Sequence, residues 1–534
     1  MKLKQRPEDF IVREAYRFEE DPRGPYRVYL MDKQKLSTFE AVQRICTRMR
    51  IPPAAVSFCG LKDKQGRTEQ IVAIRGKDAE MQDPDLRLKF LGRASEPLSA
   101  ANLTANRFAV TVRDLGEEDV ARLASSVAEV RRVGVVNYFD SQRFGALKHG
   151  QGFIAKDLIK NQVEHALHNY MAKPSPLDKS DDAKVKAFWE KNWGDWERHC
   201  PYKAVAKYRN VLLHLQDYPD DWAGAFLQIE PRYRALLIFE YQSWLWNEGV
   251  RRLLQGFLPD EDLISLRYQA GRLLFPREIP GAILRDLRER TFPLLAPETE
   301  FADERTREAA EATLAREHLR LPDLKMHHLP GMFFKHEERQ ILIYPGKLVV
   351  SEPRRDEMNR GRLKVNVAFT LPPGAYATLV TKRLFWFAML EEEAMSHGGE
   401  LHPVAAQALE AAYGPGGIRE ELRDERPRRQ LQTAATAVTT GALASLHATE
   451  PSPAVEVAAA LAEAPKAKMG YRERQRRKKD QKAQARAQAP NPAGTGKRAP
   501  AKRAKAAAAA AEQAGGGKAA NVPQKKQAGS KRRG

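Results

Sequence analysis

The segment SFCGLKDKQGRTEQ, at residues 57–70, places Asp63 in a short turn bounded by two glycines, with Lys62 and Lys64 on either side. A carboxylate held ionised in a pocket that excludes bulk water can act as a nucleophile or as a base. Burial alone would favour its neutral form, so an opposed cation is the necessary complement. Because a lone turn of this composition is also typical of solvated surface, the case for Asp63 depends on the rest of the chain.

Two further segments are unlike ordinary core sequence: NYFDSQRFG at 137–145 and FTLPPGAYATLVTKRL at 369–384. The first holds an amide, Asn137, two residues before an aromatic side chain, Phe139. Taken alone, a core aromatic and a turn-capping amide are the simplest explanations of these two residues. The Pro-Pro-Gly sequence of the second segment predicts a stiff turn into a strand.

Together the three segments resemble the signatures of the TruD-type tRNA pseudouridine synthases: a GxKD turn followed by T and Q, an NYF..QRFG segment, and an LP.G.(Y/F)AT segment. Weaker similarities agree, namely KQRPEDFIVRE at 4–14, LTANRFAVTVR at 103–113 and YQSWLWN at 241–247. The matches run in family order over about three quarters of the chain. One departure is Asp140, where the family usually has glycine. We expect its carboxylate to point away from the RNA or to pair with Arg143.

The resemblance implies an isomerase that converts uridine to pseudouridine in tRNA, with uridine 13 of the D stem as its target. This reaction breaks the bond between base and ribose, turns the base and rejoins it through carbon, so it requires no cofactor. Asp63 would serve as nucleophile or base, and the sequence leaves that choice open. By the same resemblance, Lys4 is the charge partner of Asp63, Phe139 the stacking aromatic and Asn137 the active-site amide.

Other polar side chains within two of these motifs are candidates for holding RNA phosphates or the motif loops. They are Lys62, Lys64, Arg67, Gln142 and Arg143. A rival interpretation is a non-catalytic RNA-binding or RNA-chaperone protein whose affinity comes from a basic C-terminal tail. Retention of all the core motif residues argues against this rival, because a buried and costly aspartate has no physical use without catalysis.

Hydrophobic periodicity indicates which elements must position the motifs. Alternation predicts strands near 10–12, 26–30, 71–74, 108–112, 341–344 and 365–371. Helical spacing predicts a helix after the capping-box pair Ser37 and Glu40, another over 120–130 that stops near Gly134, and a third over 233–254.

This order of elements predicts an α+β fold. A catalytic core with a mixed, mainly antiparallel sheet would be interrupted by an inserted, mostly helical domain. The expected ranges are 1–150 and 341–395 for the two parts of the core, 151–340 for the inserted domain, and 396–534 for a disordered tail rich in Ala, Pro, Lys and Arg.

Charge is distributed unevenly along the 534 residues, whose formal net charge is +20. Residues 466–534 carry 21 lysines and arginines against three acids, which leaves a net charge of +2 for everything before them. We therefore expect the tail to supply long-range, salt-dependent attraction to RNA, while the folded part relies on local patches.

Other features favour a cytoplasmic enzyme. The three cysteines, Cys46, Cys59 and Cys200, are too scattered for a disulfide framework, and neither a secretory signal nor a membrane-spanning stretch is apparent. His327, His328 and His336 lack other ligands at suitable spacing, so no metal site is predicted. We expect a monomer whose partner is tRNA, with no protein partner implied.

Overall fold

The computed structural model describes residues 1–147, 152–175 and 178–390. The predicted tail, 396–534, lies outside the described residues, and so does the end of the predicted core at 391–395. Within the described part, no helix combines the length and the apolar content needed to cross a membrane.

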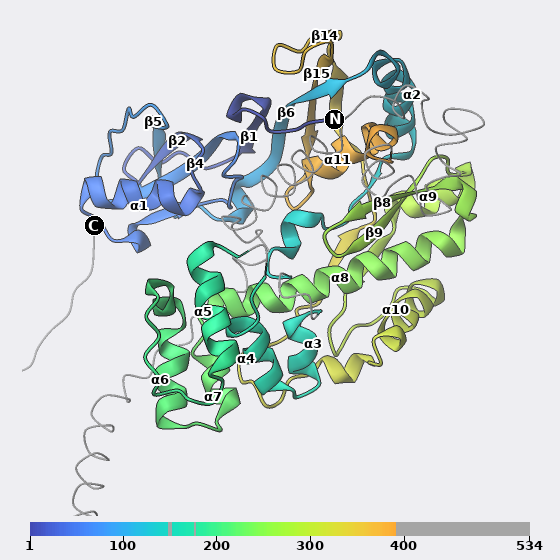
Figure 1. Cartoon of the computed structure of the whole chain (residues 1–534). Helices are drawn as coiled ribbons and strands as arrows, with labels where there is room; N and C mark the ends of the chain where they lie inside the picture. Colours follow the sequence, from blue (N-terminus) through green and yellow to red (C-terminus); the bar gives the residue numbers. More distant parts are fainter. Residues whose placement is uncertain (148–151, 176–177, 391–534) are drawn as a thin grey trace, which may run out of the picture. The chain divides into compact units, whose positions relative to one another are not determined.

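The largest sheet in the described part of the chain joins strands from both of its ends (Figure 1). Its order is β13-β15-β6-β1-β4-β2-β5, with β14 paired to β15 and β3 paired to β4. Among the described strands of this sheet, only β1 and β4 pair in parallel. The strands are β1 (Phe10–Tyr16), β2 (Tyr26–Gln34), β3 (Val56–Phe58), β4 (Arg67–Arg75), β5 (Leu86–Ala94), β6 (Leu103–Leu115), β13 (Gly346–Val350), β14 (Arg354–Arg355) and β15 (Leu363–Leu371). The predicted α+β class with a mixed, mainly antiparallel sheet is confirmed.

The register of β4 places the turn that carries Asp63. This strand lies between the two opening strands, β1 and β2, so those two do not pair with each other. Arg67, the first residue of β4, lies opposite Ile11 of β1. The turn before Arg67 therefore lies beside the start of β1 and next to the N-terminal segment that contains Lys4.

Helices cover this sheet. The predicted capping box is present: Ser37 and Glu40 exchange hydrogen bonds at the start of α1 (Thr38–Met49), whose buried face packs against β2, β4 and β5. The predicted helix before Gly134 is α2 (Glu117–Val133), which packs against α11 (Ala377–Leu384).

The segment from 152 to 340, called the middle segment below, is mostly helical. Its longest element, α8 (Pro231–Phe257), contains the predicted helix at 233–254. The other helices are α3 (Ile154–Ile159), α4 (Val163–Met171), α5 (Ser180–Lys191), α6 (Arg209–Asp217), α7 (Trp222–Leu227), α9 (Gly281–Glu289) and α10 (Glu304–Arg316). The sequence prediction missed its short strands: a hairpin of β8 (Leu263–Tyr268) and β9 (Gly271–Pro276), and β10 (Thr291–Leu294) paired with β11 (Glu337–Gln340). The predicted strand at 341–344 is only β12 (Leu342–Ile343), which pairs with β7 (Val135–Val136).

The prediction that the Pro-Pro-Gly turn leads into a strand is wrong. The strand, β15, precedes the turn, and the helix α11 follows it. Pro372 cannot donate to a ladder, and Gly374 takes a positive φ of 78°, which glycine adopts without steric cost. Beyond them, buried residues recur at helical spacing, at Ala377, Val380 and Leu384. That pattern, and not period-two alternation, determines the element.

Candidate active site

Asp63 is a buried carboxylate with a charged partner. Its Oδ2 contacts the ammonium of Lys4, and its Oδ1 accepts a hydrogen bond from the Gln65 backbone N–H at 2.8 Å. Only 12% of the Asp63 side chain is exposed, against 22% for Lys4. Burial by itself would raise the pKa of Asp63. The attraction and hydrogen bond of Lys4, the Gln65 N–H and the charge of Lys33 outweigh that effect, so the pKa is lowered and the carboxylate stays ionised at neutral pH.

A second lysine near Asp63, Lys33, is fully buried and was missed by the sequence analysis. The ammonium of Lys33 donates to the backbone carbonyls of Leu36 at 2.6 Å, Lys62 at 3.3 Å and Asp63 at 3.1 Å. Three carbonyls on one ammonium fix the path of the turn, and they place a positive charge behind Asp63.

The rest of the turn is held by buried hydrogen bonds and by close packing. Gln70 donates through Nε2 to the carbonyl of Gly60 at 3.0 Å and accepts from the Thr38 hydroxyl at 2.8 Å. A Cβ at Gly66 would stand 2.2 Å from the Phe10 carbonyl oxygen, so only glycine lets the turn approach β1 this closely. These contacts keep Asp63 in one position relative to the sheet.

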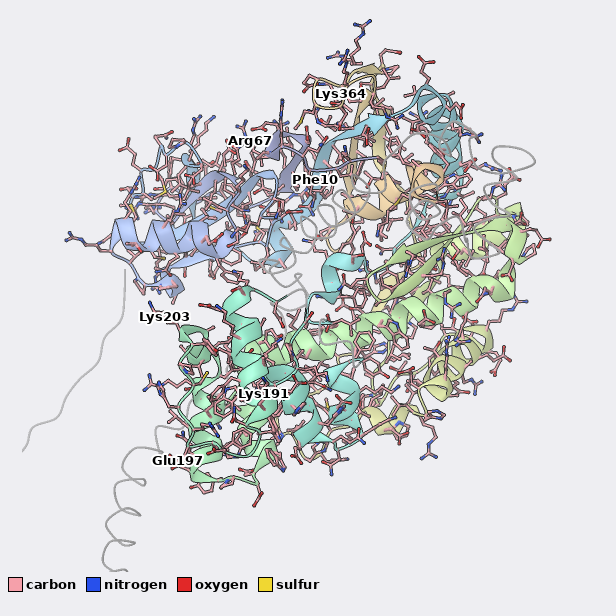
Figure 2. All side chains as sticks on the ribbon, in the orientation of Figure 1. Phe10, Arg67, Lys191, Glu197, Lys203 and Lys364 are labelled. Atoms are coloured by element: carbon pink, nitrogen blue, oxygen red, sulfur yellow. The ribbon has the colours of Figure 1, made fainter. Side chains whose placement is uncertain are left out.

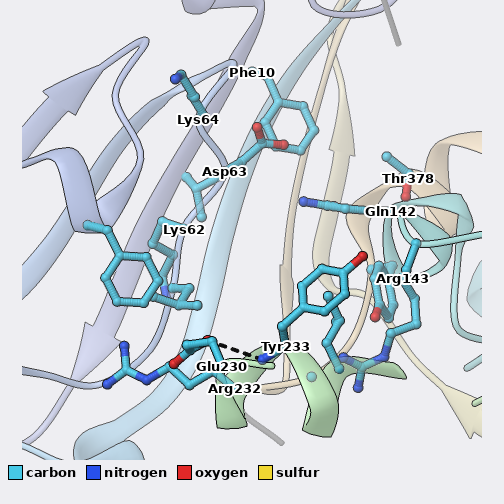
Figure 3. Close-up of a pocket in the computed structure, with 18 of the residues that line it drawn as sticks. Phe10, Lys62, Asp63, Lys64, Gln142, Arg143, Glu230, Arg232, Tyr233 and Thr378 are labelled. Carbon is cyan, nitrogen blue, oxygen red and sulfur yellow. Dashed lines mark hydrogen bonds between the residues drawn. The ribbon is translucent and has the colours of Figure 1, made fainter. Parts of the chain in front are cut away.

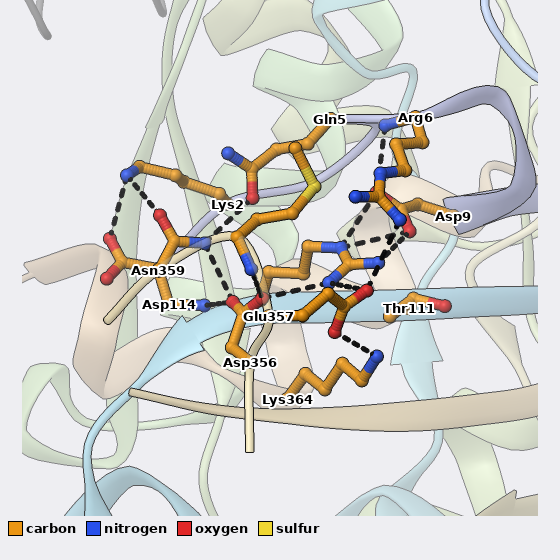
Figure 4. A network of polar contacts seen from close by, with 12 residues as sticks. Lys2, Gln5, Arg6, Asp9, Thr111, Asp114, Asp356, Glu357, Asn359 and Lys364 are labelled. Carbon is orange, nitrogen blue, oxygen red and sulfur yellow. Dashed lines mark hydrogen bonds and ion pairs between the residues drawn. The ribbon is translucent and has the colours of Figure 1, made fainter. Parts of the chain in front are cut away.

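The N-terminal segment that carries Lys4 is anchored through Arg113 of β6. The Arg113 guanidinium donates to both oxygens of Asp9, at 2.9–3.0 Å, and to Asp356 at 2.9 Å, and Lys2 exchanges backbone hydrogen bonds with Arg113. Figure 4 shows Lys2, Asp9 and Asp356 gathered in this network. Lys4 itself has a φ of 55°, which is unusual outside glycine. The network thus holds Lys4 in a conformation that directs its ammonium to Asp63.

Asn137 is joined to Arg339, a β11 residue outside all three sequence motifs. Arg339 donates to the Asn137 side-chain oxygen at 2.8 Å, to the Asn137 backbone carbonyl at 2.9 Å and to the Gly374 carbonyl at 3.1 Å. Asn137 also donates to the Gln340 carbonyl at 3.1 Å. Burial lowers the pKa of Arg339 to about 10, yet it stays charged at neutral pH. One guanidinium therefore ties the NYF segment to the LPPGAY turn.

Phe139 lies buried behind the cavity that contains Asp63, and its ring does not line that cavity. The Arg339 guanidinium lies 4.2 Å from the ring centroid and that of Arg143 lies 5.3 Å from it, while Trp246 and Tyr376 contact it edge-on. Stacking of a base on Phe139 remains a prediction, and it requires Tyr376 or another neighbour to move.

A cavity of about 950 Å³ opens in front of Asp63 (Figure 3). Aromatic residues on its walls include Phe10, Phe108 and Tyr376. Phe10 packs on Phe108 with ring centroids 6.1 Å apart, and the ammonium of Lys4 lies 4.2 Å from the Phe10 centroid. The cavity has room for a nucleotide base, and it combines apolar faces with an ionised carboxylate.

Three of the five predicted RNA-binding residues are paired with carboxylates. The pairs are Lys62 with Glu14 at 2.6 Å, Lys64 with Glu40 at 2.7 Å, and Arg67 with Asp32 at 2.6 Å. The first pair is buried, so Lys62 braces the turn; the other two are partly exposed and could exchange a carboxylate for a phosphate at small cost.

The other two, Gln142 and Arg143, line the cavity from η4 (Ser141–Phe144). Arg143 is buried and donates through Nε to the Ser243 hydroxyl of α8 at 3.1 Å.

Asp140 is buried and pairs with the ammonium of Lys382, on α11. Of the two alternatives expected for its carboxylate, pairing with Arg143 is therefore wrong, and orientation away from the RNA stays a prediction. Only 3% of the Asp140 side chain is exposed, and Lys382 is mostly covered, with 13% exposed. Burial would raise the pKa of Asp140, but the charge and hydrogen bond of Lys382, the Thr378 hydroxyl and the Ser141 N–H lower it. The added carboxylate is thus compensated within the protein, and it joins the NYF segment to the helix after the LPPGAY turn.

Comparison with known proteins identifies the family. The family described as tRNA pseudouridine synthase D (TruD) matches residues 1–384. A Methanocaldococcus jannaschii relative, named "Probable tRNA pseudouridine synthase D 2", is 33% identical over 392 residues, covering 72% of this chain and 92% of the relative. The Aquifex aeolicus tRNA pseudouridine synthase D is 27% identical over 393 residues, covering 72% and 98%. A TruD crystal structure from Methanosarcina mazei superposes with a TM-score of 0.56 at 26% identity, covering 72% of this chain and 93% of that one.

The chain therefore belongs to the TruD family of tRNA pseudouridine synthases. This membership confirms the class of enzyme that the sequence motifs predict.

Proposed function

We propose that this protein converts uridine to pseudouridine in tRNA, at uridine 13 of the D stem, with Asp63 as the acting carboxylate. The observation that carries the proposal is the ion pair of Asp63 and Lys4 at the wall of an aromatic-lined cavity large enough for a base. Family membership supports the reaction, and the positive charges of Lys4 and Lys33 support the ionised state of Asp63.

The chemistry assigned to the site is an isomerisation. The target uridine leaves its stack, and its base enters the cavity between the aromatic walls. Asp63 either attacks the sugar or removes a sugar proton, and the bond from the ribose to the base nitrogen breaks. The base turns and a bond forms from the ribose to carbon 5 of the base, as the Asp63–sugar bond breaks or Asp63 returns the sugar proton. The hydrogen on carbon 5 leaves as a proton, and the freed base nitrogen takes up a proton from solvent. The number of atoms in the base and ribose is unchanged, so no oxidant, reductant or cofactor takes part.

Other residues position the substrate. Asn137, held by Arg339, supports the motif loop or the base, and Phe139 becomes the stacking platform once it is uncovered. Arg143 and Gln142 contact the RNA inside the cavity. On the partly exposed surface, Lys64 and Arg67 exchange their carboxylates for phosphates. The protein acts as a cytoplasmic monomer, and the basic tail raises its nonspecific affinity for tRNA.

The test of the target position uses two tRNA transcripts that differ only in having uridine or cytidine at position 13. Pseudouridine is mapped after incubation with the full-length protein. We expect one modified site in the first transcript and none in the second. Pseudouridine at another position in both transcripts would contradict the assignment of uridine 13 while leaving the reaction itself intact.

A further inference from the structure

The wall of the cavity that faces Asp63 comes from the middle segment. It is built by α5, by η5 (Lys203–Tyr208) and by the first turn of α8. Figure 3 shows Tyr233 rising from α8 into the cavity, across from Asp63 and below Gln142. None of the three sequence motifs contains a residue of this wall.

The backbone and the ring of Tyr233 are both held by contacts with neighbouring residues. Glu230 caps α8, and its carboxylate accepts the Tyr233 N–H at 3.2 Å. The Tyr233 ring packs against Tyr170, with centroids 5.4 Å apart. Among the described residues, the Tyr233 hydroxyl has no hydrogen-bond partner, and burial raises its pKa well above the usual value. The hydroxyl is therefore a neutral donor at physiological pH, presented to whatever fills the cavity.

Two cations that line the same wall as Tyr233 have no carboxylate partner among the described residues. Lys203 is exposed, and no carboxylate oxygen lies within 4.0 Å of it in the described part of the chain. Arg232 is likewise without such a partner among those residues, and its guanidinium lies 5.5 Å from the ring of Phe39 on α1. The acids of the same wall are engaged: Asp182 with Lys207 at 3.0 Å, Asp181 with Lys184 at 3.7 Å, and Glu230 as the cap of α8.

We propose that Tyr233, Arg232 and Lys203 form an RNA-binding subsite on the wall opposite Asp63. The Tyr233 hydroxyl donates a hydrogen bond to the nucleotide in the cavity, and the two cations bind phosphates of the same strand. Bases, riboses and phosphates all offer acceptors to a neutral hydroxyl, while unpaired cations select an anionic strand. The inference rests on the proposed function, since it names how the middle segment holds the same RNA.

The test compares Tyr233→Phe and Lys203→Gln with Lys191→Gln as the matched control. Lys191, at the end of α5, is also an exposed lysine of the middle segment but does not line the cavity (Figure 2). The dissociation constant for tRNA is measured with full-length protein over a range of salt concentrations, and Tm is measured for each variant.

The two substitutions have different expected signatures. Lys203→Gln lowers the slope of log Kd against log salt concentration by about 0.7–0.9, as expected for one lost phosphate contact. Tyr233→Phe raises Kd about 3- to 10-fold with an unchanged slope, since one neutral hydrogen bond is lost. Lys191→Gln changes neither quantity, and all Tm values stay close to that of the unsubstituted protein.

The subsite is refuted if Tyr233→Phe and Lys203→Gln bind tRNA as Lys191→Gln does, whether or not the enzyme makes pseudouridine. Failure of the proposed function has a different signature: the unsubstituted protein would bind tRNA and yield no pseudouridine. The two failures are therefore distinguishable in one set of samples.

Discussion

Replacing Lys4 by methionine removes the charge that keeps Asp63 ionised and retains a side chain of similar length. The Gln65 N–H and the charge of Lys33 remain as the groups that favour the carboxylate. Burial, the largest opposing effect, is almost unchanged because the variant side chain covers the same space. The pKa of Asp63 therefore rises in Lys4→Met.

The size of the effect follows from the exposure of the pair. Two unit charges about 4 Å apart attract each other by about 4 kcal/mol at an effective dielectric constant of about 20. Solvent reaches 22% of Lys4 and 12% of Asp63, and the remaining partners compensate in part, so we take half of this value, about 2 kcal/mol. Since about 1.4 kcal/mol is a factor of ten, ionisation of Asp63 becomes about 30-fold less favourable.

The assay is kcat/KM for tRNA between pH 5 and pH 9. In the unsubstituted protein the lowered pKa of Asp63 keeps activity independent of this carboxyl throughout the range. In Lys4→Met the pKa of Asp63 rises toward this range. Because that pKa starts below the ordinary value of about 3.9, a 30-fold less favourable ionisation lowers activity at pH 5 by up to about 3-fold relative to alkaline pH. Lys2→Met is the control, because Lys2 is a more exposed lysine that pairs with Asp114 at 3.4 Å. A Lys4→Met profile identical to that of Lys2→Met would refute the reasoning.

Three further outcomes follow from the structure. Asp140→Asn should lower the free energy of unfolding in urea by about 3–5 kcal/mol, because the mostly buried Lys382 loses its charged partner. The double variant Asp140→Asn, Lys382→Met should recover part of this loss. The pKa of Asp140 is lowered in the folded state, so its contribution to the free energy of unfolding is present above about pH 4 and is lost as the pH falls further. The unfolding curves of the unsubstituted protein and of Asp140→Asn should therefore converge in acid. Arg339→Met should lower kcat about 10- to 100-fold with KM nearly unchanged, since the RNA-contacting walls remain while Asn137 loses its support; a change in KM alone would contradict this. A chain lacking residues 396–534 should keep its kcat, and its KM should depend less steeply on salt.

Elements encoded by neighbouring residues could be predicted from the sequence. The capping box of Ser37 and Glu40 and the helix stop at Gly134 each depend on contacts within a few residues, and both occur in the structure. The resemblance to a family supplied what local patterns cannot. It paired Lys4 with Asp63, which lie 59 residues apart, and the structure brings their charged groups into contact.

The roles of residues that act through contacts distant in sequence could not be predicted from the sequence. Lys33 lies in the polar run at 32–34, at the end of β2, which is typical of solvent-exposed sequence, yet the fold buries it behind the Asp63 turn. Arg339 belongs to the charged run EERQ, which is typical of surface, and its role depends on partners at 137 and 374. At Tyr233 the sequence predicted only that the residue begins a helix. In each case the role is set by tertiary contacts that no local pattern records.

The central claim is that Asp63 acts in the isomerisation of uridine, and the most direct test is tritium release from tRNA labelled at carbon 5 of uracil. The unsubstituted protein and Asp63→Asn are compared under single-turnover conditions. The control is Asp83→Asn, because Asp83 pairs with Arg48 at 2.9 Å and neither residue lines the cavity. We predict release by the unsubstituted protein and by Asp83→Asn, no detectable release by Asp63→Asn, and similar tRNA affinity for all three. Release by Asp63→Asn at the rate of the control would contradict the account.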